Sequence, residues 1–466
     1  MRTRPLLGLL STLALAACGG NECKLEDPKS CAAGLVCEKV TGKDKPACFA
    51  PVQVQGTVKD LATAAALANA DVAALNLDGA PLGPLATSGS DGTYTLNVPS
   101  VRSDEKGTPV AVKLTLRAGA TGYANFPSGL RVSLPLDTGA AVRAADGKPW
   151  VLKTAQTDVA LDKLADAMQG RPSVSGTVES GGAATLVAVE GNGEVHTAVA
   201  DSSGAFRVFN VPAGGGQKVQ GYTKGLNYTA LSIDVQSGAN ATGLSLKKST
   251  QAAGTLQGSV QLVAGANGAG TSVVVVLEST FKEAFGRGEA LPGLRAPEGT
   301  AAPSVTGAWT IAGVPDGKYV VLAAFENDGN VRDPDPNISG TQVAHVTVAG
   351  GVPSANPVFK VTGAVEMVGP GASGEVELVT GSPLFQWKPY SSAKTYGLKV
   401  YDTFGTELWS QPLILDVKNA QGNVEQAYGG PTLKAGQVYA WRVTARGNQL
   451  NPISQTEELR GLFGVK

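Results

Sequence analysis

Residues suited to catalysis are scarce in this 466-residue chain. It has two histidines, His196 and His345, and both lie within alternating runs that predict β-strands. Neither a Gly-x-Ser-x-Gly nor a His-Glu-x-x-His motif occurs. Because nucleophilic catalysis needs a base beside the nucleophile, we expect a protein that is not an enzyme and has no catalytic residue.

Charge and long apolar segments are limited as well. Charged residues make up 17% of the chain and the formal net charge is −1. Without a basic cluster the chain lacks the footprint that a phosphate backbone requires, so we expect no nucleic-acid partner. No apolar run after the first segment reaches the roughly 18–20 residues that span a bilayer. The length exceeds one hydrophobic core and predicts about three or four domains.

The N-terminal segment has the three-part organisation of a secretory signal. Arg2 and Arg4 precede an apolar run over 6–17, which ends in Leu-Ala-Ala-Cys18-Gly19. This ending resembles the lipobox of bacterial lipoproteins, and the resemblance implies a signal peptide over 1–17 and a diacylglyceryl group on Cys18. It also implies a membrane partner through that lipid, and Gly19, where aspartate would favour the inner membrane, implies the outer membrane. The alternative is an ordinary signal peptide with a coincidental cysteine.

All five cysteines lie within the first 48 residues. If Cys18 carries lipid, four remain: Cys23, Cys31, Cys37 and Cys48. A short polar segment (18–50) in an oxidising compartment cannot bury its own core, so these four predict two disulfides. Three pairings are possible, and we favour Cys23–Cys37 with Cys31–Cys48. A zinc site is the alternative, but the gaps are longer than its usual Cys-x2–4-Cys spacing.

From residue 51 the apolar residues alternate in short runs separated by Gly, Asp, Asn or Pro. This pattern predicts an all-β fold of tandem antiparallel β-sandwiches after the small disulfide-rich segment. One stretch, 161–168, has helical spacing. It can equally be a final strand over 159–161 followed by a linker.

A cassette of glycine, aromatic and aliphatic residues recurs three times. Its glycines, Gly92, Gly204 and Gly307, are 112 and 103 residues apart (204 − 92 and 307 − 204), which is a domain length. We expect each glycine to form a turn with positive φ, and the aromatic residue and the aliphatic residue two places on to point into one core. A Gly-x-Val strand precedes each copy, at 56–58, 176–178 and 258–260.

This order of motifs resembles the carboxypeptidase regulatory-like (transthyretin-like) sandwich, most closely in the third copy, where Gly317-Lys318-Tyr319 completes it. The resemblance implies three such sandwiches over 51–170, 171–250 and 251–362, with a non-catalytic accessory, spacing or binding role. The first copy departs from the pattern, since a charged connector over 103–106 replaces the short hairpin.

The last hundred residues, 363–466, have a different pattern. A Leu433-x-x-Gly-x-x-Tyr439-x-Trp-x-Val run resembles the tyrosine-corner strand of fibronectin type III domains, with Trp387 as the core tryptophan of an earlier strand. The resemblance implies that the Tyr439 hydroxyl bonds to backbone a few residues upstream. We therefore expect a structural role for Tyr439.

Two loops could carry function. An acidic loop in the third sandwich offers the oxygen ligands that calcium prefers, and the candidate ligands are Glu326, Asp328, Asn330, Asp333 and Asp335. The alternative, which we favour, is a solvated turn that binds no metal. No other cofactor is expected. The second loop is an insertion over 280–304, which we expect to be disordered, although its apolar Phe281, Phe285 and Leu291 favour a function.

Together these patterns predict a lipid-anchored outer-membrane protein. Stacked end to end, its modules would form a rod of roughly 100–150 Å. The expected function is to project β-sandwich modules for non-catalytic binding of carbohydrate or protein. The alternative is a structural or scaffolding subunit of an outer-membrane complex, without a soluble ligand, that binds by strand addition.

Overall fold

The computed structural model describes residues 23–466 except 26, 130, 146–148, 180–183, 264–265, 267–269, 284–285 and 325–328. Cys18 and the rest of the lipobox therefore lie outside the described residues. In the described part of the chain no helix is long and apolar enough to cross a membrane. The fold is all-β, and its helical turns are short 3-10 segments.

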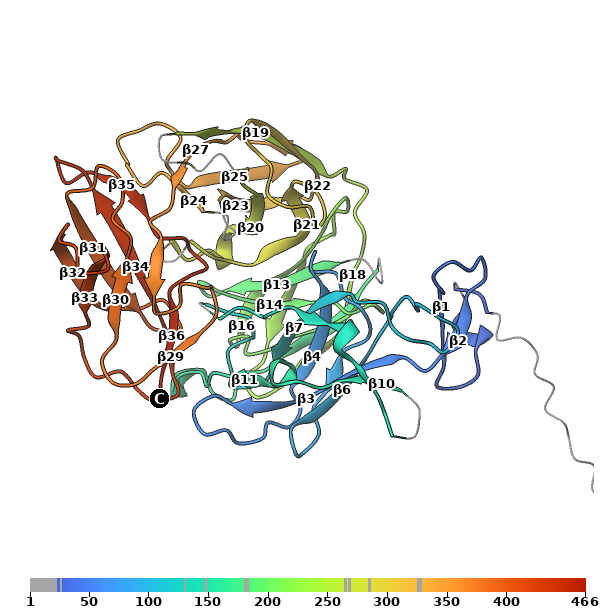
Figure 1. Ribbon diagram of the computed structural model, residues 1–466. Coiled ribbons are helices and arrows are strands. Elements are labelled where there is room, and N and C mark those ends of the chain that lie inside the picture. The colour runs from blue at the N-terminus through green and yellow to red at the C-terminus, as the bar shows by residue number, and fades with distance from the viewer. Residues whose placement is uncertain are drawn as a thin grey trace, which may run out of the picture.

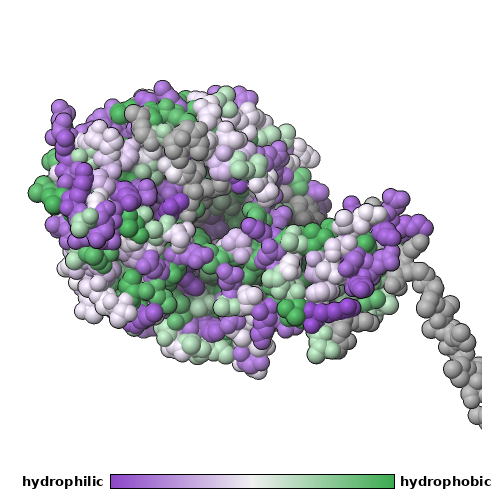
Figure 2. Space-filling view, viewed as in Figure 1, coloured by the Kyte–Doolittle hydropathy of each residue, from purple (hydrophilic) through white to green (hydrophobic). Residues whose placement is uncertain are grey.

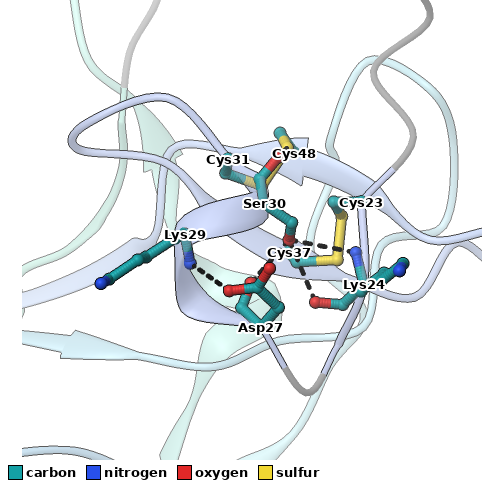
Figure 3. Close-up of a disulfide and its surroundings, with 8 residues drawn as sticks. All are labelled: Cys23, Lys24, Asp27, Lys29, Ser30, Cys31, Cys37 and Cys48. Atoms are coloured by element: carbon teal, nitrogen blue, oxygen red, sulfur yellow. Dashed lines mark hydrogen bonds between the residues drawn. A yellow bond between two sulfur atoms is a disulfide. The ribbon is translucent and has the colours of Figure 1, made fainter.

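The N-terminal module consists of η1 (Pro28–Ser30) and a hairpin of β1 (Val36–Glu38) and β2 (Ala47–Phe49). Its disulfides join Cys23 to Cys37 and Cys31 to Cys48, the pairing favoured above (Figure 3). Cys37 and Cys48 are cross-strand partners in the hairpin. Each disulfide therefore joins the segment before the hairpin to one of the two hairpin strands. Because all four cysteines are in disulfides, none is left as a thiolate ligand for the zinc alternative.

Three β-sandwiches follow. We name them by their strands: sandwich 1 spans β3–β11, sandwich 2 spans β12–β18 and sandwich 3 spans β19–β27. The elements of sandwich 1 are β3 (Val52–Asp60), β4 (Asp71–Asn76), β5 (Ala86–Thr87), β6 (Thr93–Val98), β7 (Lys113–Gly119), β8 (Leu136–Asp137), η2 (Thr138–Ala140), β9 (Val142–Arg143), β10 (Trp150–Leu152), η3 (Ala155–Thr157), β11 (Val159–Leu161) and η4 (Asp166–Met168). The stretch 161–168 is thus a final strand and a single 3-10 turn, not a longer helix.

The next two sandwiches repeat the arrangement. The strands of sandwich 2 are β12 (Val174–Val178), β13 (Thr185–Gly191), β14 (Glu194–Val199), β15 (Ala205–Val208), β16 (Gly214–Thr223), β17 (Leu231–Val235) and β18 (Ala241–Leu246). The elements of sandwich 3 are β19 (Gly254–Leu262), β20 (Val273–Leu277), η5 (Glu278–Thr280), β21 (Ala290–Ala296), β22 (Ala308–Val314), β23 (Gly317–Ala323), β24 (Asn330–Arg332), β25 (Ala344–Ala349), β26 (Val352–Pro353) and β27 (Val358–Gly363).

One strand order recurs in all three sandwiches. The first sheets share the order β6–β3–β11, β15–β12–β18 and β22–β19–β27, and the second sheets share β5–β4–β7–β8, β14–β13–β16–β17 and β21–β20–β23–β25. The additional strands are β9 and β10 in sandwich 1 and β24 and β26 in sandwich 3. Most pairs are antiparallel, but β11, β18 and β27, together with β10 in sandwich 1, pair in parallel with the Gly-x-Val strand of their own sandwich.

The recurring glycine and aromatic residue are cross-strand partners. Gly56 lies opposite Tyr94, Gly176 opposite Phe206 and Gly258 opposite Trp309. A Cβ on Gly56 would lie 2.1 Å from the backbone oxygen of Thr157 and 2.9 Å from the Tyr94 hydroxyl, so the missing side chain makes room for the neighbouring backbone and for the tip of the Tyr94 side chain. The cassette turn differs between copies: Gly92 and Gly204 have positive φ, as expected, whereas Gly307 does not.

Sandwich 4 comprises the remaining strands: β28 (Met367–Gly369), β29 (Glu377–Val379), β30 (Leu384–Trp387), β31 (Thr395–Tyr401), β32 (Glu407–Leu415), β33 (Val424–Ala427), β34 (Val438–Arg446), β35 (Pro452–Gln455) and β36 (Leu462–Val465). Trp387 and Trp441 are fully buried in its core, with ring centroids 6.2 Å apart. The Tyr439 hydroxyl accepts a hydrogen bond from the backbone N–H of Lys434 at 2.8 Å. This is the contact that the tyrosine-corner resemblance implies.

The expected rod is wrong, because the four sandwiches pack into one compact body from which the N-terminal module projects (Figure 1). The reason is visible in the strands: β4, β13 and β20 bury side chains on both faces. One face of β13 lines the core of sandwich 2, whereas Leu186 and Ala188 on the other belong to a cluster shared with Leu75 of sandwich 1 and Tyr319 of sandwich 3. Strands buried on both faces read as continuous apolar runs.

Candidate functional site

The described residues of the insertion at 280–304 pack between sandwiches 1, 2 and 3, so the expectation of disorder is wrong. Its strand β21 completes the second sheet of sandwich 3, and its Leu291 and Leu294 are buried in the core that sandwiches 1, 2 and 3 share. Phe281 packs against Val276 and Val320 on the other face of that sheet, while Phe285 lies outside the described residues. Gly293 donates its N–H to the carbonyl of Asp78 in sandwich 1.

A buried ion pair lies where three sandwiches meet. Arg117 of sandwich 1 donates two hydrogen bonds to Glu289 of the insertion, at 2.9 and 2.8 Å, and one to Thr197 of sandwich 2 at 3.0 Å. Thr197 in turn donates to Glu289 at 2.8 Å. Burial alone would raise the pKa of the Glu289 carboxyl, but the Arg117 charge and these hydrogen bonds hold it below its usual range.

Sandwiches 1 and 2 are also joined by neutral hydrogen bonds. Asn210 accepts from the N–H of Gly122 and donates to the carbonyls of Ala120 and Tyr123, all in sandwich 1. On another side of the same joint, the Asp201 carboxylate accepts the N–H of Leu85 at 3.1 Å. Fixed at separate points, the two sandwiches have a defined relative position.

Arg287, in sandwich 3, connects sandwich 4 with sandwich 1. This buried side chain donates to the carbonyl of Gly129 in sandwich 1 at 3.3 Å and to the carbonyl of Glu458 in sandwich 4 at 2.8 Å. Burial, with the nearby charge of Arg442, lowers the pKa of Arg287 to about 9. The Glu457 carboxylate adds a hydrogen bond from the N–H of Gly329 at 2.8 Å.

The N-terminal module docks onto sandwich 1 through Arg102, which is completely buried. Its guanidinium donates to Glu38 of the module at 2.5 Å, to the carbonyl of Gly107 at 2.8 Å and to the carbonyl of Ala50 at 2.8 Å. The Arg102 guanidinium also lies over the Phe49 ring, 5.2 Å from its centroid. The charged connector that distinguishes the first copy therefore begins directly after the residue that holds the module.

An open trough runs beside the joint of sandwiches 1 and 2. Its volume is about 490 Å³, and its lining combines the β4–β5 side of sandwich 1 with the first sheet of sandwich 2. At its wall the Asp71 carboxylate pairs with Arg207 at 3.3 Å and accepts the Thr87 hydroxyl at 2.9 Å. Burial raises the pKa of Asp71, an effect that Arg207 and Thr87 partly oppose.

The candidate calcium ligands do not form one described group. Glu326 and Asp328 lie outside the described residues, and Asn330 begins β24. Asp333 and Asp335 are buried rather than solvated, so the favoured turn interpretation is wrong on this point. Asp335 accepts the N–H of Asn337 at 3.0 Å and the side-chain amide of Asn451 in sandwich 4 at 3.2 Å, so it links two sandwiches.

Exposed apolar side chains gather at the edge of sandwich 4. Strand β32 is the last strand of its sheet and pairs with β31 only, among the described residues. Leu413, Leu415 and, just beyond the strand, Val417 are 51%, 62% and 68% exposed. Elsewhere the visible face of the body shows hydrophilic and hydrophobic residues interspersed (Figure 2). An apolar edge strand is a template for strand addition.

Each of the two histidines contacts a glutamate. His345 is exposed on β25 and its Nδ1 lies 2.5 Å from the Glu278 carboxylate. His196 on β14 contacts Glu194 at 3.2 Å, and burial lowers its pKa. Neither has a serine, threonine or cysteine side chain among its described hydrogen-bond partners.

Sequence reasoning missed Arg102, Arg117, Glu289 and Arg207. Their partners lie in other modules, so local spacing held no signal for three of them. Arg102 had one, because the connector it precedes departs from the repeat pattern.

No protein-family model and no curated protein matches the chain. Several solved structures are similar to it. The Bacillus anthracis TIE protein is 12% identical over 85% of this chain and 63% of its own length, with a TM-score of 0.15. A streptococcal ancillary pilin is 12% identical over 67% of this chain and 98% of its own, with a TM-score of 0.18. A DUF3823 family protein from Bacteroides ovatus is 11% identical over 46% of this chain and 100% of its own, with a TM-score of 0.20.

Proposed function

We propose that this chain is a lipid-anchored protein of the bacterial outer membrane that presents a compact β-sandwich body for non-catalytic binding of carbohydrate or protein. The lipid on Cys18 would hold the N-terminal module at the membrane. We further propose that sandwiches 1 to 3 are carboxypeptidase regulatory-like and that sandwich 4 is fibronectin type III-like. The repeated glycine–aromatic pair supports the first assignment, and the Tyr439 contact with Lys434 supports the second.

The observation that carries the proposal is the fixed attachment of the disulfide-bonded N-terminal module, where the described part of the chain begins, to the body. The first described residue, Cys23, lies five residues after Cys18 and is already bonded to Cys37. Arg102 then fixes the module to sandwich 1 through a buried ion pair. A flexible tether would need neither bond. The module projects from one side of the body, with sandwich 4 on the other (Figure 1), so an anchor on it leaves most of the surface accessible.

The test is the intact mass of the mature protein extracted from membranes, with and without reductant. We expect a chain that starts at Cys18, carries acyl groups and gains about four daltons on reduction of two disulfides. A chain that starts elsewhere and carries no lipid would contradict the proposal.

A second candidate function, a scaffolding subunit of an outer-membrane complex, is favoured by the apolar edge of β32. Strand addition there would bury Leu413 and Leu415. The test is affinity capture of membrane partners with the full chain and with a Leu413→Asp/Leu415→Asp variant. Val352→Asp, at a valine that is 66% exposed on β26, is the matched control. The scaffolding function is supported if the native chain and Val352→Asp capture one stoichiometric partner and the double variant does not. Equal capture by all three chains contradicts it.

A further inference from the structure

The trough between sandwiches 1 and 2 has a floor of small side chains. The floor is the outer face of the sheet β15–β12–β18, where Ser175, Thr177, Ser245 and Gly243 line the cavity, and Phe206 points the other way into the core of sandwich 2. Small side chains leave the sheet surface open to close approach. The Asp71–Arg207 pair forms the wall.

The polar groups of the trough retain hydrogen-bonding capacity. Arg207 reaches Asp71 through Nε and has no other polar partner in the described part of the chain; the side chain is 40% exposed. Its two terminal nitrogens, four N–H donors, are therefore available. The hydroxyls of Ser175, Thr177 and Ser245 likewise make no hydrogen bond among the described residues. These groups offer donors and acceptors side by side.

The trough is also preformed, and its three charged lining residues, Asp71, Asp201 and Arg207, leave one net negative charge. Asp71 and Arg207 carry opposite charges. The carboxylate of the third charged residue of the lining, Asp201, is occupied by hydrogen bonds from the protein itself. That carboxylate accepts from Ser203, Ala205 and Leu85. The Leu85 bond and the Asn210 bonds fix the two sandwiches relative to each other, so little ordering is needed when a ligand binds.

These features favour one class of ligand. A peptide would need a strand edge to pair with or apolar pockets for its side chains. Among the described residues β15 and β18 have a free edge, but a strand added there would lie beside the floor and not on it. The larger aliphatic side chains of the lining, Leu85 and Leu244, pack against the neighbouring cores. A polyol both donates and accepts along its length, which matches the guanidinium, the carboxylate and the row of hydroxyls. The volume lies within the range of about 300–1,000 Å³ typical of ligand pockets.

We propose that this trough is a binding site for a neutral saccharide, whose hydroxyls bond to Arg207, Asp71 and the hydroxyls of Ser175, Thr177 and Ser245. The inference rests on the proposed function, since it assigns the ligand class and location of the binding activity proposed there.

The test is calorimetric titration of the full mature chain in detergent with four separate probes: maltohexaose, cellohexaose, xylohexaose and chitohexaose. Thr177→Trp fills the trough from an exposed position, and Arg207→Gln removes the terminal donors while keeping a neutral partner for Asp71. Ser259→Trp is the control, because Ser259 occupies the position of Thr177 in the third repeat. Thermal melting checks that each variant is folded.

We expect at least one probe to bind the native chain with a dissociation constant in the millimolar range or below. Thr177→Trp and Arg207→Gln should each weaken that binding at least tenfold, and Ser259→Trp should change it less than twofold. Absence of binding by all four probes at about 10 mM, or binding that both trough variants leave intact, would overturn the inference. In the second case the binding activity stands and only its location fails, whereas failure of the proposed function would appear as a mature chain without lipid at Cys18.

Discussion

The ion pair between Arg117 and Glu289 gives a quantitative prediction about the compact body. Glu289→Ala removes one partner of a bidentate pair whose side chains are 10% and 25% exposed. Breaking a buried pair costs about 3–5 kcal/mol, since the remaining charge stays desolvated. Because Glu289 is partly exposed, we expect the lower end, about 3 kcal/mol of unfolding free energy.

The measurement is urea unfolding of the native chain, Glu289→Ala, Arg117→Met and the double variant. Replacing both partners removes the uncompensated charge, so the double variant should recover most of the lost stability. Glu298→Ala is the matched control: Glu298 pairs with Lys224 across the joint of sandwiches 2 and 3, but 78% of its side chain is exposed. If Glu289→Ala destabilises no more than Glu298→Ala, the reasoning about this joint is refuted.

Three further outcomes are expected. Arg102→Ala should leave Glu38 buried without its partner and undock the N-terminal module, so limited proteolysis should cut near residue 50 faster than in the native chain. The control is Glu105→Ala, which loses only an exposed pair with Lys43 and should be cut more slowly than Arg102→Ala. Equal rates for the two variants would contradict the docking role. The folded-state pKa of Glu289 lies below its usual value near 4.5, so its contribution to stability is complete above that pH and is lost as the pH falls through the lowered value. Glu289→Gln should therefore flatten the dependence of unfolding free energy on pH in this acidic range. An unchanged dependence would refute the assignment. Tyr439→Phe should lower the unfolding free energy by about 1–2 kcal/mol, because the N–H of Lys434 loses its acceptor; an unchanged denaturation midpoint would exclude a structural role for the hydroxyl.

The strands of each module could be predicted from sequence, because a period of two and the glycine–aromatic cassettes are local signals. Tyr94, Phe206 and Trp309 are all buried where the cassette predicts. Gly307 shows the limit, since a glycine in the same cassette position adopts a different turn.

The arrangement of the modules could not be predicted, because it depends on contacts between residues far apart in the chain. Glu289 and Arg117 are 172 residues apart, and nothing near either residue identifies the other. The insertion looked disordered because it is rich in Gly, Ala and Pro, yet its Leu291 and Leu294 are buried by neighbouring modules. The continuous run Val273–Leu277 was the signal that an outer face is covered.

The central structural claim, one compact body rather than a rod, is tested most directly by small-angle X-ray scattering of the soluble chain that begins after Cys18. A compact chain of this length should have a radius of gyration of about 22 Å, somewhat more with the projecting module. A rod of roughly 100–150 Å would instead give about 29–43 Å and the scattering profile of an elongated particle. A value of about 22–26 Å with a globular profile agrees with the packing described above, and a value in the rod range would contradict it.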